Sequence, residues 1–100
     1  KHKSRERNQA LVAAAKDAFL KNNEKLHCEI CGFDFETKYG IRGRGYIEAH
    51  HTVPVSDMAP GQKTRLEDIA LVCSNCHRML HRSRPWLEME QLRKLVIDET

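Results

Sequence analysis

Two pairs of cysteines constrain this chain more than any other feature. Cys28 and Cys31 are separated by two residues, and so are Cys73 and Cys76 much later in the chain. A two-residue spacer lets both sulfurs of a pair reach one ion, and two such pairs match a tetrahedral zinc site. A chain of 100 residues buries only a thin core, so an ion that closes the long segment between the pairs would raise its stability strongly. Four thiolates leave no open ligand position, so we expect a structural zinc ion.

Three other interpretations of the cysteines are weaker. Two disulfides would suit a secreted protein, but no secretory signal segment is visible. A redox pair would leave the other pair unexplained. A zinc site made of the second pair with His77 and His81 would take all its ligands from nine residues, too few for good tetrahedral geometry, and would leave the first pair without a role.

The composition is that of a small globular domain. Charged residues make up 31% of the chain and hydrophobic residues 40%. No apolar run approaches the roughly 20 residues of a membrane-spanning helix, so we expect no membrane partner. A net charge of +3 permits nucleic-acid binding without requiring it. The chain begins with Lys1 rather than Met, and we expect residues 1–100 to be a single domain and a fragment of a longer protein.

The apolar periodicity predicts an α+β fold. Ser4 is the expected N-cap of the first helix, and Ser83 that of a last helix whose apolar face runs from Trp86 to Val96. Alternation around Phe33 and Phe35 indicates a short strand. We expect helices over 5–22 and 74–82, strands at 33–35, 46–51 and 69–72, and loops over 39–45 and 52–66.

Four of the six histidines fall into two motifs near the cysteines. His77 and His81 are spaced i, i+4 on the predicted helix, so they share one face and can bind one metal ion. His50 and His51 are adjacent on a predicted strand, so their side chains point to opposite faces and cannot easily do the same work. One can bind a metal while the other faces a substrate.

The segments I-E-A-H-H-T-V-P-V at 47–55 and L-E-D-I-A-L-V-C-S-N-C-H-R-M-L-H-R at 66–82 resemble the HNH endonucleases. The resemblance covers about residues 26–83. It is strongest to the zinc-knuckle nucleases of bacterial restriction enzymes, including modification-dependent ones. It implies a ββα-metal core, in which a β-hairpin packs on a helix around one divalent cation, flanked here by an N-terminal and a C-terminal helix. It also implies a bacterial, cytoplasmic protein.

The resemblance also assigns roles to single residues. His51 matches the general base, His50 the first metal ligand, and His77 the ligand on the helix. His81 matches an additional ligand of histidine-rich members. The middle Asn of the family name is replaced by Asp68, which can accept hydrogen bonds but has no amide proton to donate. A carboxylate there would also raise the pKa of a nearby histidine.

We expect a metal-dependent DNA endonuclease. Imidazole titrates near neutral pH and suits a general base. A divalent ion would stabilise charge on the phosphate and on the leaving 3′-oxygen. Candidate ions are Mn²⁺, Mg²⁺, Co²⁺, Ni²⁺ and Zn²⁺, and imidazole ligands disfavour Mg²⁺. Glu48 shares a strand face with His50 and is a candidate to orient it. The candidate phosphate contacts are Arg42, Arg44, Arg78 and Arg82.

Alternatives remain. A non-catalytic zinc-knuckle module that binds nucleic acid would use the cysteines and arginines but leave the histidine motifs unexplained. Cleavage of RNA rather than double-stranded DNA is also open. Cutting both strands calls for two active sites, which favours a homodimer through the Trp86–Val96 helix.

Overall fold

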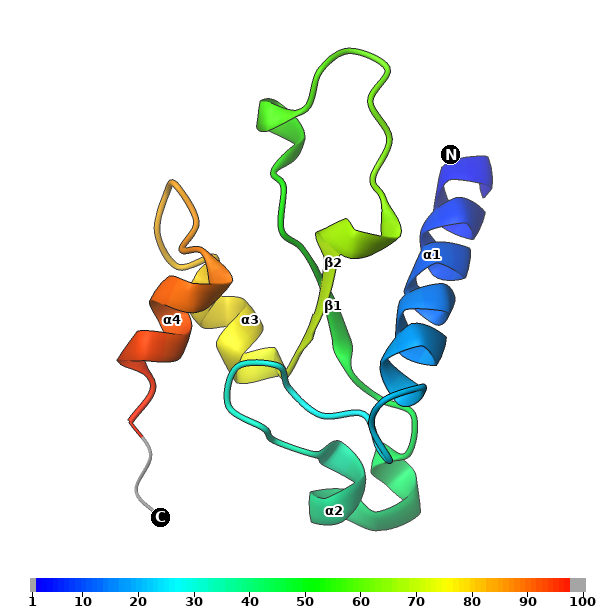
Figure 1. Ribbon diagram of the computed structural model, residues 1–100, viewed down its shortest axis with the longest axis vertical. Coiled ribbons are helices and arrows are strands. Elements are labelled where there is room, and N and C mark those ends of the chain that lie inside the picture. The colour runs from blue at the N-terminus through cyan, green and yellow to red at the C-terminus, as the bar shows by residue number, and fades with distance from the viewer. Residues whose placement is uncertain (1, 98–100) are drawn as a thin grey trace.

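The computed structural model describes residues 2–97, with the side chains of residues 8–54 and 56–97 (Figure 1). Within these residues, four helices surround a two-stranded sheet, and three short 3₁₀ turns lie in the connections. The helices and strands are α1 (His2–Leu20), α2 (Phe35–Tyr39), β1 (Glu48–His51), β2 (Ile69–Val72), α3 (Ser74–Leu80) and α4 (Met89–Leu95). This is the expected α+β fold with a ββα core. No helix in the described part of the chain is both long and apolar enough to span a bilayer.

The two strands form an antiparallel hairpin in which Glu48 lies opposite Val72 and His51 lies opposite Ile69. Paired residues of an antiparallel sheet share a face, and neighbours along a strand alternate between faces. His50 therefore lies on the same face as Val72, while His51 lies on the face of Ile69. The sheet separates the two adjacent histidines, as the sequence predicted.

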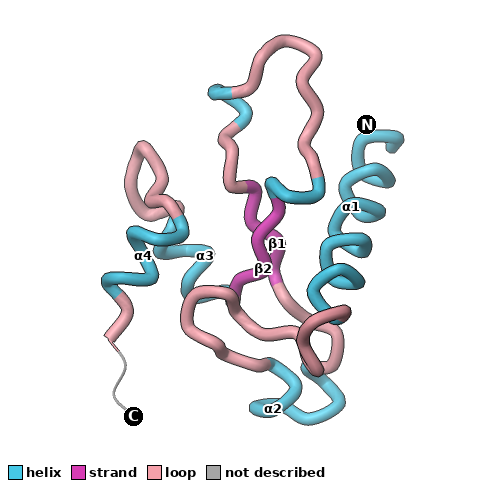
Figure 2. Tube along the Cα trace, viewed as in Figure 1, coloured by secondary structure: helices cyan, strands magenta, loops and turns pink. Residues whose placement is uncertain are grey.

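Each face of the hairpin packs on a different part of the chain (Figure 2). On one face Leu71 joins a buried cluster with Ala15 of α1 and Ile47. On the other face Val72 joins a cluster with Leu80 of α3 and Leu92 of α4. The helix after β2 is thus held against the face that carries His50. The connection between the strands extends beyond the end of the sheet, away from α2 (Figure 1).

The segment that carries the first cysteine pair is bonded to the free edge of β2. The Glu29 amide donates to the Leu71 carbonyl at 2.9 Å, and the Glu29 side chain accepts from the Leu71 amide at 2.6 Å. Arg93 of α4 donates to the Glu29 carbonyl at 2.9 Å. The backbone and the side chain of Glu29 thus make the hydrogen bonds that a third strand would make to Leu71. They hold the first cysteine pair next to the second.

The predicted strand at 33–35 is wrong. Asp34 caps α2 instead, since its carboxylate accepts from the amides of Glu36 and Thr37 at 2.9 and 3.1 Å. The turn after α2 packs back on it, and a Cβ at Gly43 would lie 2.2 Å from the Phe35 carbonyl oxygen. The segment expected to be a loop therefore contains a 3₁₀ turn, Gly40–Gly43. A residue with a side chain at Gly43 could not approach the Phe35 backbone this closely.

The helix boundaries also differ from prediction, since α1 ends at Leu20 rather than at 22 and α3 ends at Leu80 rather than at 82. The first helix already begins at His2, so Ser4 lies within it rather than at its N-cap. The last helix begins at Met89, not after Ser83. Glu88 supplies its cap, with the Glu88 amide donating to the Gln91 side chain at 2.8 Å.

Candidate active site

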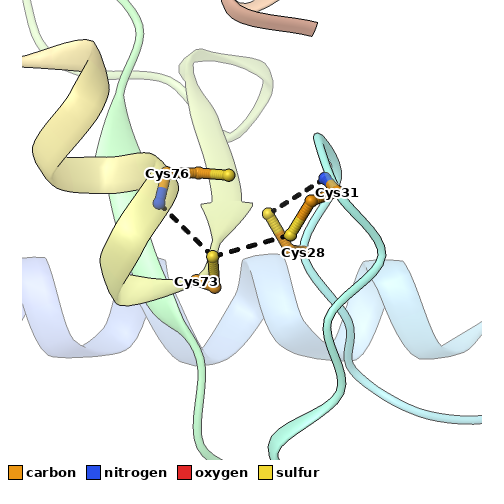
Figure 3. A group of neighbouring side chains, drawn as sticks. All are labelled: Cys28, Cys31, Cys73 and Cys76. Carbon is orange, nitrogen blue, oxygen red and sulfur yellow. Dashed lines mark hydrogen bonds between the residues drawn. The ribbon is translucent and has the colours of Figure 1, made fainter. Parts of the chain in front are cut away.

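The four cysteines converge on one point between the Cys28–Cys31 turn and the start of α3 (Figure 3). Their sulfurs all lie within 4.8 Å of one another, and the sulfurs of Cys31 and Cys73 are 3.7 Å apart. Sulfurs bound to one zinc ion at about 2.3 Å in a tetrahedron lie about 3.8 Å apart. The arrangement fits a four-thiolate zinc site and removes the alternative in which His77 and His81 complete it.

Backbone amides surround these sulfurs. The Cys28 sulfur accepts from the amides of Ile30 and Cys31 at 3.4 and 3.5 Å, and the Cys73 sulfur accepts from the Cys76 amide at 3.3 Å. Burial raises the pKa of Cys28, but these amide donors outweigh it and hold that pKa below its usual value. Burial and the neighbouring thiols raise the pKa values of Cys31 and Cys76. Four thiolates so close together need a cation, and the chemistry of the donors fits zinc.

The side chain of Cys73 is also the N-cap of α3, so the helix begins inside the cysteine cluster. One turn later the same helix carries His77, and His81 follows at its C-terminal end. These two histidines meet His50 of β1. One ring nitrogen from each of the three lies within 4.8 Å of the others. A single seven-residue helix therefore connects the cysteine cluster with a separate histidine cluster.

The geometry of the histidine cluster fits one shared cation. Nε2 of His81 and Nδ1 of His50 face each other at 3.2 Å. Nitrogens bound to one ion at about 2.1 Å stand roughly 3.0–3.4 Å apart. Burial, with the nearby imidazoles, lowers the pKa of His50 to about 4. Burial and the charge of His77 also lower the pKa of His81. Both imidazoles are thus neutral at neutral pH, which is the form that binds metals.

Glu48 contacts a different histidine from the one expected. It shares the face of His50, but its Oε1 lies 2.9 Å from Nδ1 of His77, and Tyr46 donates to its Oε2 at 2.9 Å. The hydrogen bond from His77, helped by that from Tyr46, lowers the pKa of Glu48. A carboxylate on Nδ1 fixes the tautomer and leaves Nε2 free to face the other two histidines.

His51 and Asp68 lie where the two strands part. The Thr52 amide and hydroxyl both donate to the Asp68 carbonyl, at 2.8 and 3.0 Å, which extends the pairing one residue beyond His51. The Asp68 carboxylate accepts from the Arg65 amide at 3.1 Å, and this bond lowers its pKa. The carboxylate is therefore directed at Arg65 rather than at a histidine. The Asp68 side chain acts here as an acceptor, and the Asp68 amide donates to the Arg65 carbonyl at 3.0 Å.

The four arginines lie in two separate places. Arg78 and Arg82 are exposed on and just after α3, near the histidine cluster. Arg42 and Arg44 are exposed in and directly after the Gly40–Gly43 turn, which packs on α2. α2 lies at the opposite end of the hairpin from the long connection (Figure 1). Arg44 is paired with Glu36 at 3.1 Å, which leaves Arg42 as the less constrained cation of the second group.

Sequence reasoning missed one residue of this site. Trp86 was expected on the apolar face of the last helix, but it precedes α4 and packs on the histidines. Its ring centroid lies 4.1 Å from that of His81 and 5.5 Å from that of His50. The sequence signal that could have placed Trp86 at this site is its position five residues after His81.

Comparison with known proteins agrees with this geometry. The model of the HNH endonuclease family matches residues 28–83. The chain is also 32% identical over 75 residues to the type IV methyl-directed restriction enzyme EcoKMcrA of Escherichia coli strain K12. That match covers 75% of this chain but only 26% of the relative, so the chain spans about a quarter of its length. No solved structure matches. The family match covers more than half of the chain and includes both clusters, and the chain therefore belongs to the HNH endonuclease family.

Proposed function

We propose that this chain is the cleavage domain of a restriction-type enzyme and hydrolyses phosphodiester bonds in double-stranded DNA. The observation that carries the proposal is the convergence of His50, His77 and His81 next to His51 in a chain of this family. The whole unit, residues 1–100 around a core at 26–83, acts as one domain of a longer bacterial, cytoplasmic protein. Recognition of sequence or base modification lies elsewhere in that protein.

In this mechanism the residues divide the work. His50, His77 and His81 hold one divalent cation, which supplies charge neutralisation at the phosphate and the leaving 3′-oxygen when bound. His51 accepts a proton from the attacking water. Asp68 keeps the end of β1 in place through its carbonyl and through Arg65. The products carry a 5′-phosphate and a 3′-hydroxyl. Because the three ligands are imidazoles, activity is greater with Mn²⁺, Co²⁺ or Ni²⁺ than with Mg²⁺.

Arginine side chains attract the backbone of the DNA. Arg78 and Arg82, beside the histidines, contact the phosphates nearest the cut. Arg42 and Arg44 bind farther along the duplex. Such contacts fix position without reading sequence, so the isolated chain should cut with little sequence preference.

A second copy of the chain provides the second cut. Trp86 is turned toward the histidines, so the dimer surface lies instead on the exposed apolar side chains around the end of α4. Leu95, Val96 and Ile97 are 65%, 37% and 83% exposed, and Met79 on α3 is 45% exposed. Light scattering after size exclusion should give a dimer that Leu95→Glu converts to a monomer.

The deciding experiment is incubation of supercoiled plasmid with zinc-loaded protein and Mn²⁺. We expect nicked and then linear DNA, and no cleavage in EDTA. A folded, zinc-loaded chain that binds the plasmid without cutting it would favour the non-catalytic module. A parallel reaction with structured RNA separates the remaining alternative, since preferential RNA cleavage would contradict a DNA substrate.

A further inference from the structure

Trp86 is the single tryptophan of the chain, and it lies just outside the family match, which ends at residue 83. We propose that Trp86 is a positioning residue that holds His81 in its metal-binding orientation. The segment 84–95 would then be part of the metal site rather than an appendage to it. This inference rests on the metal site of the proposed function.

His81 needs such support more than the other two histidines. His50 is 2% exposed within the sheet, and His77 lies inside α3 with its Nδ1 bonded to Glu48. His81 follows the last residue of α3 and is exposed as a whole residue. Its side chain contacts Nδ1 of His50 at 3.2 Å, and that contact joins two proposed ligand atoms. The packing of Trp86 against the ring supplies a restraint that is independent of the metal.

The backbone explains how Trp86 reaches this position. After α3 the chain turns and returns, and the Leu87 amide donates to the Leu80 carbonyl at 3.2 Å. Leu87 and Met89 then pack on the buried cluster that contains Leu80 and Leu92. These contacts anchor the chain directly after Trp86. The indole meets the His81 ring edge-on, with the planes at 68°.

A cavity next to the site shows what the indole excludes. The cavity has a volume of about 760 Å³, and its lining includes His50, Trp86, Pro54 and Asp57. Because the indole packs directly on His81, its removal would extend this cavity to the His81 ring. The imidazole of His81 would then sample more rotamers and contact water. Metal binding would have to order the ring again, which would lower the affinity for the ion.

The first test measures metal binding without DNA. Ni²⁺ is titrated calorimetrically into the zinc-loaded full chain. Trp86→Ala should weaken binding by about 10-fold, the lower end of what loss of a supporting contact costs. Trp86→Phe should restore most of the affinity because an aromatic ring still covers His81. Lys94→Ala, at an exposed site on the same segment, is the control and should bind as the wild type does. Zinc content and circular dichroism confirm that each variant is folded.

The second test keeps Trp86 in place, so it holds even if Trp86→Ala fails to fold. Ni²⁺ bound by His81 lies close to the indole and should quench its fluorescence, saturating at one ion per chain. His81→Ala should remove this saturable quenching. Wild-type affinity in Trp86→Ala, or Ni²⁺ binding without quenching in the wild type, would overturn the inference alone. A chain that binds no Ni²⁺ would overturn the proposed metal site with it.

Discussion

The cysteine cluster and the histidine cluster lie at the two ends of α3, yet they differ in almost every property that matters to a metal ion. The cysteines provide four ligands, which complete a tetrahedron, and three of them are buried. The histidines provide three ligands next to a cavity. Thiolates repel one another and need a cation to coexist, whereas neutral imidazoles do not.

This difference teaches how one short helix can serve two purposes. The cysteine site fixes where α3 begins, because the proposed zinc ligand Cys73 is also its N-cap. The open site uses the residues that the helix then presents. The first site should therefore govern whether the domain folds, and the second should govern what it does. Each of the following experiments directly changes one of the two sites.

Loss of a cysteine should have the largest effect. Cys73→Ser removes a proposed zinc ligand and weakens the cap of α3, and structural zinc contributes on the order of 10 kcal/mol to such domains. We expect loss of zinc, of the folded circular dichroism spectrum and of cleavage together. His77→Ala should keep zinc and fold. A folded, zinc-loaded Cys73→Ser chain would contradict the division between the two sites.

Loss of the proposed general base, His51, should lower the cleavage rate without changing the fold. His51→Ala should reduce the cleavage rate by about 10²–10⁴ while both metals remain bound. Single-turnover cleavage, with zinc and nickel content measured on the same sample, checks this. Equal cutting by the variant and the wild type would show that another group activates the water.

Low pH should reduce the stability of the fold because His50 is buried in its neutral form. Its pKa in the folded state is about 4, below the ordinary 6.5, because it is buried. Between these values the unfolded chain binds a proton that the folded chain does not. The free energy of unfolding therefore falls as the pH falls, by about 2 kcal/mol between pH 7 and pH 5. Denaturant titrations without added nickel should show this slope, and His50→Gln should flatten it relative to the wild type.

A smaller effect is expected at Glu48. Glu48→Gln keeps the size of the side chain but removes the charge that orients His77, so nickel affinity should fall about 10-fold with zinc unchanged. Tyr46→Phe, which removes the second hydrogen bond to the same carboxylate, should have a lesser effect in the same direction. Unchanged calorimetric affinity in Glu48→Gln would mean that the helix alone orients His77.

The sequence predicted the parts of the site that follow from local spacing. Two-residue and four-residue spacings determine which side chains share a knuckle or a helix face, and strand alternation separates His50 from His51. What it missed depends on tertiary arrangement. Both His50 and His77 lie within reach of one strand face, and only the crossing of α3 decides that Glu48 contacts His77. Trp86 fits an apolar helix face equally well until the cap at Glu88 shows where the helix begins.

The strand predicted from the alternation around Phe33 and Phe35 was wrong for another reason. Three residues are too few to distinguish a strand from the entry to a helix, and Asp34 is a favourable cap as well as a polar residue between two apolar ones. The hydrogen bonds of its carboxylate to two amides decide in favour of the helix.

The pairing of Glu29 with Leu71 has a consequence beyond the metal sites. A two-stranded sheet leaves unpaired amides and carbonyls along its edges, and such edges recruit strands from other molecules. Glu29 occupies both the donor and the acceptor of Leu71, at the middle of the outer edge of β2. An incoming strand would have to displace a residue that lies next to Cys28. The segment of the first cysteine pair, which we propose binds zinc, thus also protects the hairpin against edge-to-edge aggregation, and we expect loss of zinc to expose both the cysteines and this edge.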